Sequence, residues 1–261
     1  MTDLSRVCYK NSFLKQVIVR IDFLQFVPTT GLFNSAIEEV ILKIFPKRGK
    51  DQIIRFNEVN VFFTPDDRST PNAKGTTTEG IKKEYFTLDG TDKIALTNKS
   101  MVFEINAYQS YQLHRQWLQN IIFTFCEINR ITSVRTGIRF INIFEASRIK
   151  LQKQYFSNEI AATLMIKPNQ EKDALSLVRS MHINEYRCDS MSLNFRYGMY
   201  NPDYPNILKN NTFALDYDCY TEEPKETADD ILRTIEKGHD LIQQMFEKSI
   251  TDALRKVMKD E

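Results

Sequence analysis

The segment Gln16-Val-Ile-Val-Arg-Ile-Asp-Phe23 decides the fold class, because polar and apolar residues alternate along most of it. Successive side chains of a β-strand point to opposite faces, so a period of two predicts a strand with one face in a core. The core face would hold Val17, Val19, Ile21 and Phe23, and the other face Gln16, Ile18, Arg20 and Asp22. Two charges inside this strand therefore belong to the face that points away from the core.

The same reading predicts further strands along the chain. They cover residues 53–63, 84–88, 93–97, 100–108, 132–145, 155–166, 177–187, 191–200 and 212–220. A change of phase near Asn57 and Glu58 indicates a β-bulge. The stretch from Thr64 to Gly80 is rich in Pro, Asp, Ser, Thr and Asn, which predicts an exposed, mobile loop.

Three stretches with a helical period predict helices. The first begins with Ser35-Ala-Ile-Glu38, which has the spacing of a capping box, and it ends before Pro46. The second spans residues 110–129, and the third spans 227–258 from a cap at Thr227. The apolar stripe of the second contains Leu113, Trp117, Ile121, Ile122, Phe125 and Ile128. That of the third contains Ile231, Ile235, Ile242, Phe246, Ile250 and either Leu254 or Val257.

These elements predict an α+β protein with one or more antiparallel sheets of about eight to ten strands. Two long helices and one short helix would cover one side. The strand at 100–108 and its helix resemble the strand at 212–220 and its helix, which predicts two pseudo-repeats, residues 1–130 and 131–261, in one compact unit. The alternative is that any meander that ends in a helix produces this likeness.

The composition bears on several classes of function. Lys and Arg number 35 against 34 Asp and Glu, so the net charge of +1 provides no general attraction to nucleic acid or an anionic membrane. Only 8 of the 261 residues are glycine, which disfavours glycine-rich phosphate loops. No apolar run approaches the ~20 residues that cross a bilayer, and the first residues lack the pattern of a signal peptide. The four scattered cysteines disfavour a zinc site of the usual spacing and fit reduced thiols in a cytoplasm.

Charges inside the predicted strands form the candidate ligand-binding site. If their faces converge, the arginines could hold a phosphate or carboxylate bidentately, and the carboxylates could bind a divalent metal. Gly137, between two of the arginines, would allow a ligand or another backbone to approach closely. The alternative is that these charges are ordinary cross-strand pairs on a solvated face. The candidate residues are Arg20, Asp22, Glu104, Arg135, Arg139, Arg196, Asp216 and Asp218.

No catalytic or metal-binding motif is recognisable, so we predict no catalytic residue, no metal site and no cofactor. The histidines, His114, His182 and His239, have no metal-ligand spacing, and no Gly-x-Ser-x-Gly elbow occurs. His114 and His239 near helix starts are interpreted as packing or capping residues. Trp117 is expected to anchor its helix on the sheet.

Four segments carry a family resemblance: Leu14-Lys-Gln-Val-Ile-Val-Arg-Ile-Asp-Phe23, Leu113-His-Arg-Gln-Trp117, Ile131-Thr-Ser-Val-Arg-Thr-Gly-Ile-Arg-Phe-Ile-Asn142 and the closing helix around residues 246–254. With them the chain resembles a sporadically distributed family of bacterial proteins that has no assigned activity. The resemblance implies a mixed α+β protein of about this length, often encoded near phage-defence or mobile-element genes.

Together these features predict a non-enzymatic binding, adaptor or sensor protein of bacterial antiviral defence, located in the cytoplasm. Its partner would be a protein, such as an effector subunit or a phage product, or an anionic small molecule, in preference to nucleic acid and without a membrane. The aromatic stretch from Tyr197 to Tyr204 is a candidate contact surface. Two alternatives remain: a nucleotide-binding sensor that uses the arginines, and a metal-dependent phosphoester hydrolase that uses carboxylates such as Glu104 and Asp216.

Overall fold

A computed structural model describes residues 9–64, 67–145, 147–164, 177–209 and 212–259 of the chain. Its strands are β1 (Leu14–Phe23), β2 (Lys47–Arg48), β3 (Gln52–Thr64), β4 (Asp67–Phe86), β5 (Lys93–Thr97), β6 (Ser100–Ile105), β7 (Ser133–Phe144), β8 (Ser180–Cys188), β9 (Met191–Met199) and β10 (Phe213–Thr221). Its helices are α1 (Thr29–Leu32), α2 (Ser35–Leu42), α3 (Tyr111–Asn129), α4 (Asn158–Thr163), α5 (Ala228–Ser249) and α6 (Asp252–Lys259), with a 3₁₀ turn η2 (Lys153–Tyr155).

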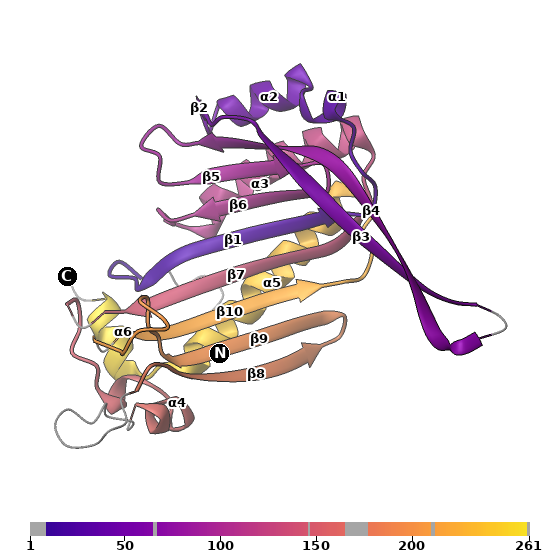
Figure 1. Cartoon of the computed structure of the whole chain (residues 1–261). Coiled ribbons are helices and arrows are strands. Elements are labelled where there is room, and N and C mark those ends of the chain that lie inside the picture. The colour runs from indigo at the N-terminus through magenta and orange to yellow at the C-terminus, as the bar shows by residue number, and fades with distance from the viewer. Residues whose placement is uncertain (1–8, 65–66, 146, 165–176, 210–211, 260–261) are drawn as a thin grey trace.

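In the described part of the chain, the strands form one ten-stranded antiparallel sheet. Their order is β2-β4-β5-β6-β1-β7-β10-β9-β8, and β3 pairs with β4 (Figure 1). This arrangement confirms the predicted α+β class and the antiparallel sheet.

The two halves of the chain repeat one topology. β1, α2, β4, β5, β6 and α3 follow each other in the first half, and β7, α4, β8, β9, β10 and α5 follow in the second. Read towards the centre of the sheet, the strand orders are β4-β5-β6-β1 and β8-β9-β10-β7. Since β1 and β7 pair antiparallel, a pseudo-twofold axis passes between them. The expected pseudo-repeats are therefore present in the topology, with β2 and β3 added to the first.

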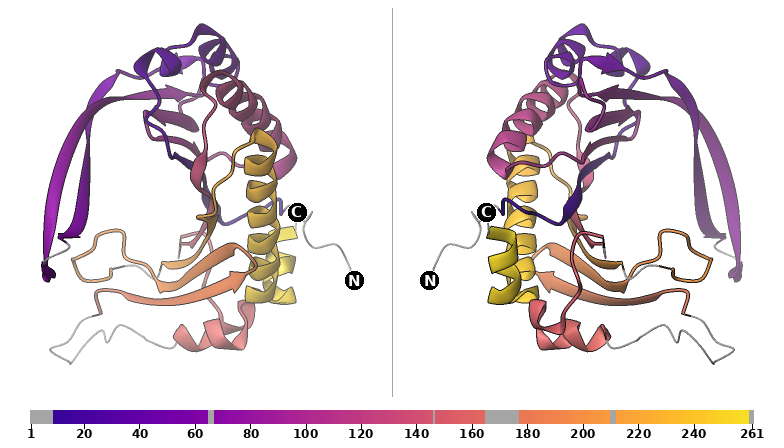
Figure 2. Two further views of the ribbon diagram at one scale, coloured as in Figure 1. Left: turned by 90° about the vertical axis from the view of Figure 1, so that its right-hand side faces the viewer. Right: turned by 90° about the vertical axis from the view of Figure 1, so that its left-hand side faces the viewer.

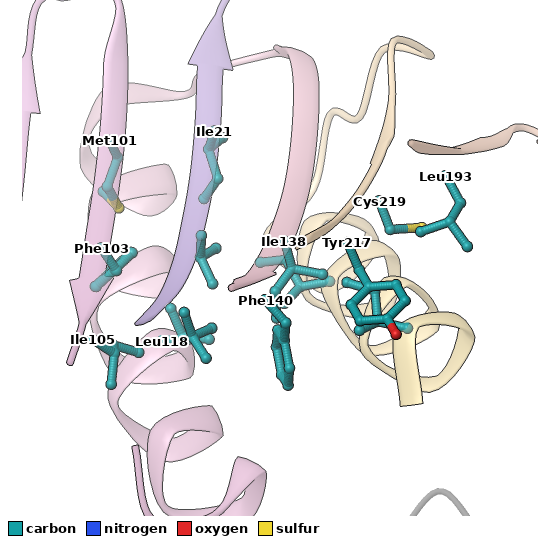
Figure 3. Close-up of a cluster of buried hydrophobic side chains, with 14 of the residues drawn as sticks. Ile21, Met101, Phe103, Ile105, Leu118, Ile138, Phe140, Leu193, Tyr217 and Cys219 are labelled. Atoms are coloured by element: carbon teal, nitrogen blue, oxygen red, sulfur yellow. The ribbon is translucent and has the colours of Figure 1, made fainter. Parts of the chain in front are cut away.

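The core lies between the sheet and the two long helices. α3 and α5 contact each other and cover the same face of the sheet (Figure 2). Val17, Val19 and Ile21 of β1 are buried on this face, as their alternation predicts. Residues from β6, β7, β9, β10 and α3 belong to the same cluster (Figure 3). Gly238 allows α5 to approach β7 closely, because a Cβ there would lie 2.8 Å from the Cγ2 of Ile138.

The two predicted caps, at Thr227 and Ser35, have different outcomes. Thr227 caps α5 as predicted, since its Oγ1 accepts a hydrogen bond from the Asp230 N–H at 3.1 Å. The predicted cap at Ser35 is wrong, because the side chain of Asn34 accepts from the Ala36 N–H at 2.9 Å and Ser35 is the first helical residue. A short polar side chain one residue earlier already satisfies the free amide.

Trp117 is half-buried and packs against the hydrophobic core. It meets the ring of Phe45, which follows α2, edge-on with centroids 5.9 Å apart. His114 and Leu118 on either side of it are buried in α3. The helix contacts α2 as well as α5, so its apolar surface is wider than a single stripe.

The predicted loop at residues 64–80 is wrong, because most of it belongs to the long strand β4. Residues 65–66 lie outside the described residues. β3 and β4 form a hairpin that leaves the sheet and extends over the face opposite α3 and α5 (Figures 1 and 2). Its register is continuous through Asn57 and Glu58, so the predicted bulge there is wrong; the register shifts between Phe63 and Thr64. Backbone pairing along the hairpin outweighs the low strand preference of this stretch.

Two further elements differ from the sequence predictions. The strand expected at 155–166 consists of the end of η2 and the helix α4, and its residues 165–166 lie outside the described residues. The single helix expected at 227–258 is divided into α5 and α6, because Ile250 is extended and forms a β-bridge with Phe156. The Thr251 N–H also donates to the Tyr155 carbonyl at 3.0 Å. Tertiary backbone pairing therefore interrupts a helical pattern that is continuous in the sequence.

Candidate functional site

The eight predicted site residues all lie on one face of the sheet, the face opposite α3 and α5, which we call the outer face. The pairing register places them there, since directly opposite residues of antiparallel strands share a face. Asp22 lies opposite Arg135, and Asp218 lies opposite Arg139. The register also sets Asp216 opposite Arg196, Arg20 opposite Gly137, and Glu104 opposite Ile18.

Asp216 is the centre of the charge network on this face. The Nε and Nη2 of Arg139 donate to its Oδ1 and Oδ2, each at 2.7 Å. Nη1 of Arg196 donates to Oδ2 at 3.4 Å, so one carboxylate serves two guanidinium groups. The hydrogen bond to Asp216 raises the pKa of Arg139 above its ordinary value. The Asp216 side chain is 10% exposed, so its carboxylate is largely shielded from water.

Two further ion pairs flank this centre. Arg20 Nε lies 2.8 Å from Asp22 Oδ1, and Arg135 Nη2 lies 3.7 Å from Asp218 Oδ2. The Arg135 guanidinium also stacks 4.4 Å above the Tyr220 ring. The close neighbour of Gly137 is this same tyrosine, because a Cβ on Gly137 would lie 2.7 Å from the Cβ of Tyr220. Gly137 therefore permits close packing of β7 on β10.

Glu104 belongs to a second network, nearer the other end of the sheet. Its Oε1 lies 3.1 Å from Lys93 Nζ, and Lys93 in turn lies 3.4 Å from Glu84. Glu84 also accepts from Lys82 at 2.9 Å, and that bond holds the pKa of Glu84 below its ordinary value. Sequence reasoning missed these last three residues, although residues 82–86 and 93–97 alternate in the same way as β1.

The geometry separates the carboxylates that a hydrolytic metal site would need. β1 and β7 lie between the strand of Glu104 and the strand of Asp216. At a strand spacing of ~4.8 Å, three steps place these side chains ~14 Å apart, too far to share a cation. Within the described ranges, no three or more His, Cys, Asp and Glu residues are grouped so that they could hold a metal ion.

Arginine donors exceed aspartate acceptors at the centre of the outer face. Arg20, Arg135, Arg139 and Arg196 stand against Asp22, Asp216 and Asp218, a local surplus of one positive charge, four minus three. The Arg139 side chain remains 36% exposed despite its bidentate bond. A guanidinium has five N–H donors, so these arginines can bind an additional anionic group without breaking the existing pairs.

An aromatic loop lies on the same side of the molecule. The residues after β9 project from the sheet on the side of the outer face, as the β3–β4 hairpin does (Figure 2). Tyr200 and Tyr204 are exposed in this loop, and Arg179 lies 4.4 Å above the Tyr204 ring. Tyr197, by contrast, is buried within β9, so the candidate contact surface is limited to the residues that follow the strand.

The histidines lie away from the outer-face charges. His114 and His239 are buried on the helix-covered side, as expected of packing residues, and burial lowers the pKa of each. The His114 Nδ1–H donates to the Ser110 carbonyl at 2.7 Å. His182 stacks on Tyr197 of the neighbouring strand with ring centroids 5.3 Å apart.

The fold and this face together define an α+β protein with a charged sheet surface built on a pseudo-twofold repeat. No protein-family model matches the chain, and no curated protein is similar to it in sequence. No helix in the described ranges has both the length and the apolar character that crossing a membrane requires.

Proposed function

We propose that this chain is a non-enzymatic binding protein, an adaptor or sensor, whose outer face receives an acidic segment of a protein partner. The observation that carries the proposal is the shared carboxylate of Asp216. Because it serves both Arg139 and Arg196, arginine donors remain available at the centre of the face. A carboxylate of the partner would complete the pairing.

The surroundings of the face support an extended partner over a compact one. The β3–β4 hairpin and the loop that contains Tyr204 project on the side of the outer face, from opposite ends of the sheet (Figure 2). Exposed tyrosines next to arginines are typical of protein contact surfaces, since their rings supply area at a low entropic cost. A segment bound across the strands would meet both.

The distribution of the carboxylates disfavours the hydrolase alternative. Asp22, Asp216 and Asp218 each face an arginine, and Glu104 faces Lys93. A carboxylate that is already paired with a guanidinium would have to give up that partner before it could bind a cation. The nucleotide-sensor alternative uses the same arginines, and the binding experiment below separates it from the present proposal.

The cellular setting is part of the proposal. The family resemblance implies a bacterial antiviral context, in which the partner would be an effector subunit or a phage protein. Three described cysteines, Cys126, Cys188 and Cys219, are free thiols, which is compatible with the reducing cytoplasm that we propose.

The experiment is fluorescence anisotropy with a labelled peptide of alternating Glu and Ser. We expect saturable binding that weakens with salt, and weaker binding to a Lys/Ser peptide and to ATP. Replacing Arg139 and Arg196 by Gln should reduce the affinity about tenfold, the equivalent of one lost charge-assisted bond. Arg233→Gln is the matched control, because Arg233 is an exposed, ion-paired arginine on α5. If the Arg139 and Arg196 double variant and the control Arg233→Gln weaken peptide binding equally, the proposal is contradicted. Tighter binding of ATP than of the acidic peptide would favour the nucleotide sensor.

A further inference from the structure

A cleft of about 600 Å³ lies beside α3 and α5, on the helix-covered side of the sheet. Its walls come from both helices, from the start of the described chain near Tyr9, and from β7. This volume is within the ~300–1,000 Å³ range of small-molecule sites. We infer that the cleft binds a planar, uncharged nitrogen heterocycle that carries an amino group, such as the base of a nucleoside.

Aromatic rings form one wall of this cleft. The Tyr111 and His239 rings stack with centroids 4.1 Å apart, and Phe140 meets His239 edge-on at 5.8 Å. Tyr108 lies edge-on to Phe140 at 5.5 Å. Such a cluster offers flat apolar surfaces to a planar ligand, which favours a heterocycle over an aliphatic chain.

Two buried side chains of the cleft offer hydrogen-bond acceptors, His239 through Nε2 and Asn142 through Oδ1. His239 places its Nδ1–H 3.1 Å from the Asp240 carboxylate, so its Nε2 carries a lone pair. Asn142 donates from Nδ2 to the Leu215 carbonyl at 3.4 Å, which leaves its Oδ1 to accept. Both residues are about 95% buried and line the cleft. We expect a ligand amino group in the cleft to donate to one or both of these acceptors.

The charges of the cleft point to an uncharged ligand. Its charged lining residues are Arg115, Glu236 and Asp240, and Arg115 Nε lies 3.5 Å from a Glu236 carboxylate oxygen. The remaining Asp240 gives the lining a net negative charge, which disfavours a phosphate. Burial lowers the pKa of His239, so its imidazole is neutral near pH 7 and adds no positive charge. Amide side chains supply further donors and acceptors: Gln109, Gln112, Gln116, Gln119 and Gln243.

Isothermal titration calorimetry of the full chain with adenosine and with cytidine tests the inference. We expect one site per chain for at least one nucleoside, and weaker binding of the corresponding monophosphate. His239→Leu should weaken the binding by about tenfold or more, because it removes an acceptor and half of the aromatic stack. His182→Leu is the matched control, since His182 also stacks on a tyrosine but lies on β8, outside the cleft.

The inference would be overturned if neither nucleoside gives binding heat at concentrations up to about 1 mM, because a Kd of about 1 mM is the weakest binding that the inference allows. Equal weakening by His239→Leu and His182→Leu would also overturn it. If His239→Leu does not fold, the imidazole ¹⁵N signals of the unmodified protein provide the readout: at least one of the two nucleosides should shift Nε2 of His239 and leave His182 unchanged. Neither result depends on the outer face, so the two proposals fail separately.

Discussion

Replacing Asp216 by Asn tests whether the charge network of the outer face is organised around this carboxylate. Asp216 accepts two bonds of 2.7 Å from Arg139 and a longer one from Arg196. Asparagine has nearly the same shape, but it has no charge and presents an N–H₂ where one acceptor oxygen stood. The substitution therefore removes the bidentate geometry with almost no change in volume.

The expected loss of stability in Asp216→Asn follows from the two short hydrogen bonds that Asp216 accepts from Arg139. A hydrogen bond to a charged group contributes about 1.5–3 kcal/mol, so two such bonds in a buried site would contribute about 3 kcal/mol or more. The Arg139 side chain is 36% exposed, and water compensates part of the loss. We expect Asp216→Asn to lower the free energy of unfolding by about 2 kcal/mol. Asp218→Asn is the control, because its 3.7 Å contact with Arg135 is longer than a hydrogen bond, and about 0.5 kcal/mol is expected.

Urea unfolding, followed by far-UV circular dichroism and by the fluorescence of Trp117, gives both values. A loss for Asp216→Asn within about 0.5 kcal/mol of the control would refute the reasoning. The double replacement Arg139→Met with Asp216→Leu adds a second check. A paired charge replaced by packed apolar groups is often neutral for stability, so this variant should keep its fold and most of its free energy of unfolding.

Three other predictions concern the fold. Gly238→Val should lower the free energy of unfolding by about 2–3 kcal/mol, because a Cβ there meets the Ile138 side chain at 2.8 Å. Thermal unfolding measures this loss. An unchanged stability would contradict the close approach of α5 to β7. Asn34→Ala should lower the free energy of unfolding by about 1 kcal/mol and Ser35→Ala by much less, because Asn34 is the cap of α2. If urea unfolding shows the larger loss for Ser35→Ala, the cap is Ser35, as the sequence predicts. Burial alone would raise the pKa of Glu38, but a tyrosine hydroxyl and nearby cations outweigh it and hold that pKa below the ordinary 4.5. Its stabilising contribution is complete above 4.5 and is lost as the pH falls through the lower folded pKa, so the unmodified protein should lose more stability on acidification than Glu38→Gln.

The shared face of the charged residues could be predicted from the sequence, because it depends only on the period of two within each strand. Arg20 and Asp22 alternate with buried residues, and Arg139 likewise lies between two buried residues of its strand. Which arginine meets which aspartate could not be predicted, since that depends on the register between strands far apart in the sequence. The bidentate bond between Arg139 and Asp216 joins residues 77 positions apart.

The errors share a physical cause, which is pairing between distant backbones. Residues 67–80 look like a loop, and they become a strand because β3 supplies a partner along most of their length. Ile250 fits a helical stripe, but its backbone pairs with Phe156 and divides the last helix. The cleft near His239 was missed because its lining residues come from separate segments that no local pattern links.

The most direct test of the binding-face hypothesis is ¹⁵N NMR of the arginine side chains in the unmodified protein, titrated with the Glu/Ser peptide. The Nε–H signals of Arg139 and Arg196 should shift first, followed by those of Arg20 and Arg135, because these four groups lie on the outer face. Those of Arg233 and Arg255, in α5 and α6, should stay unchanged. Shifts confined to the helix arginines, or no shifts at saturating peptide, would contradict the hypothesis.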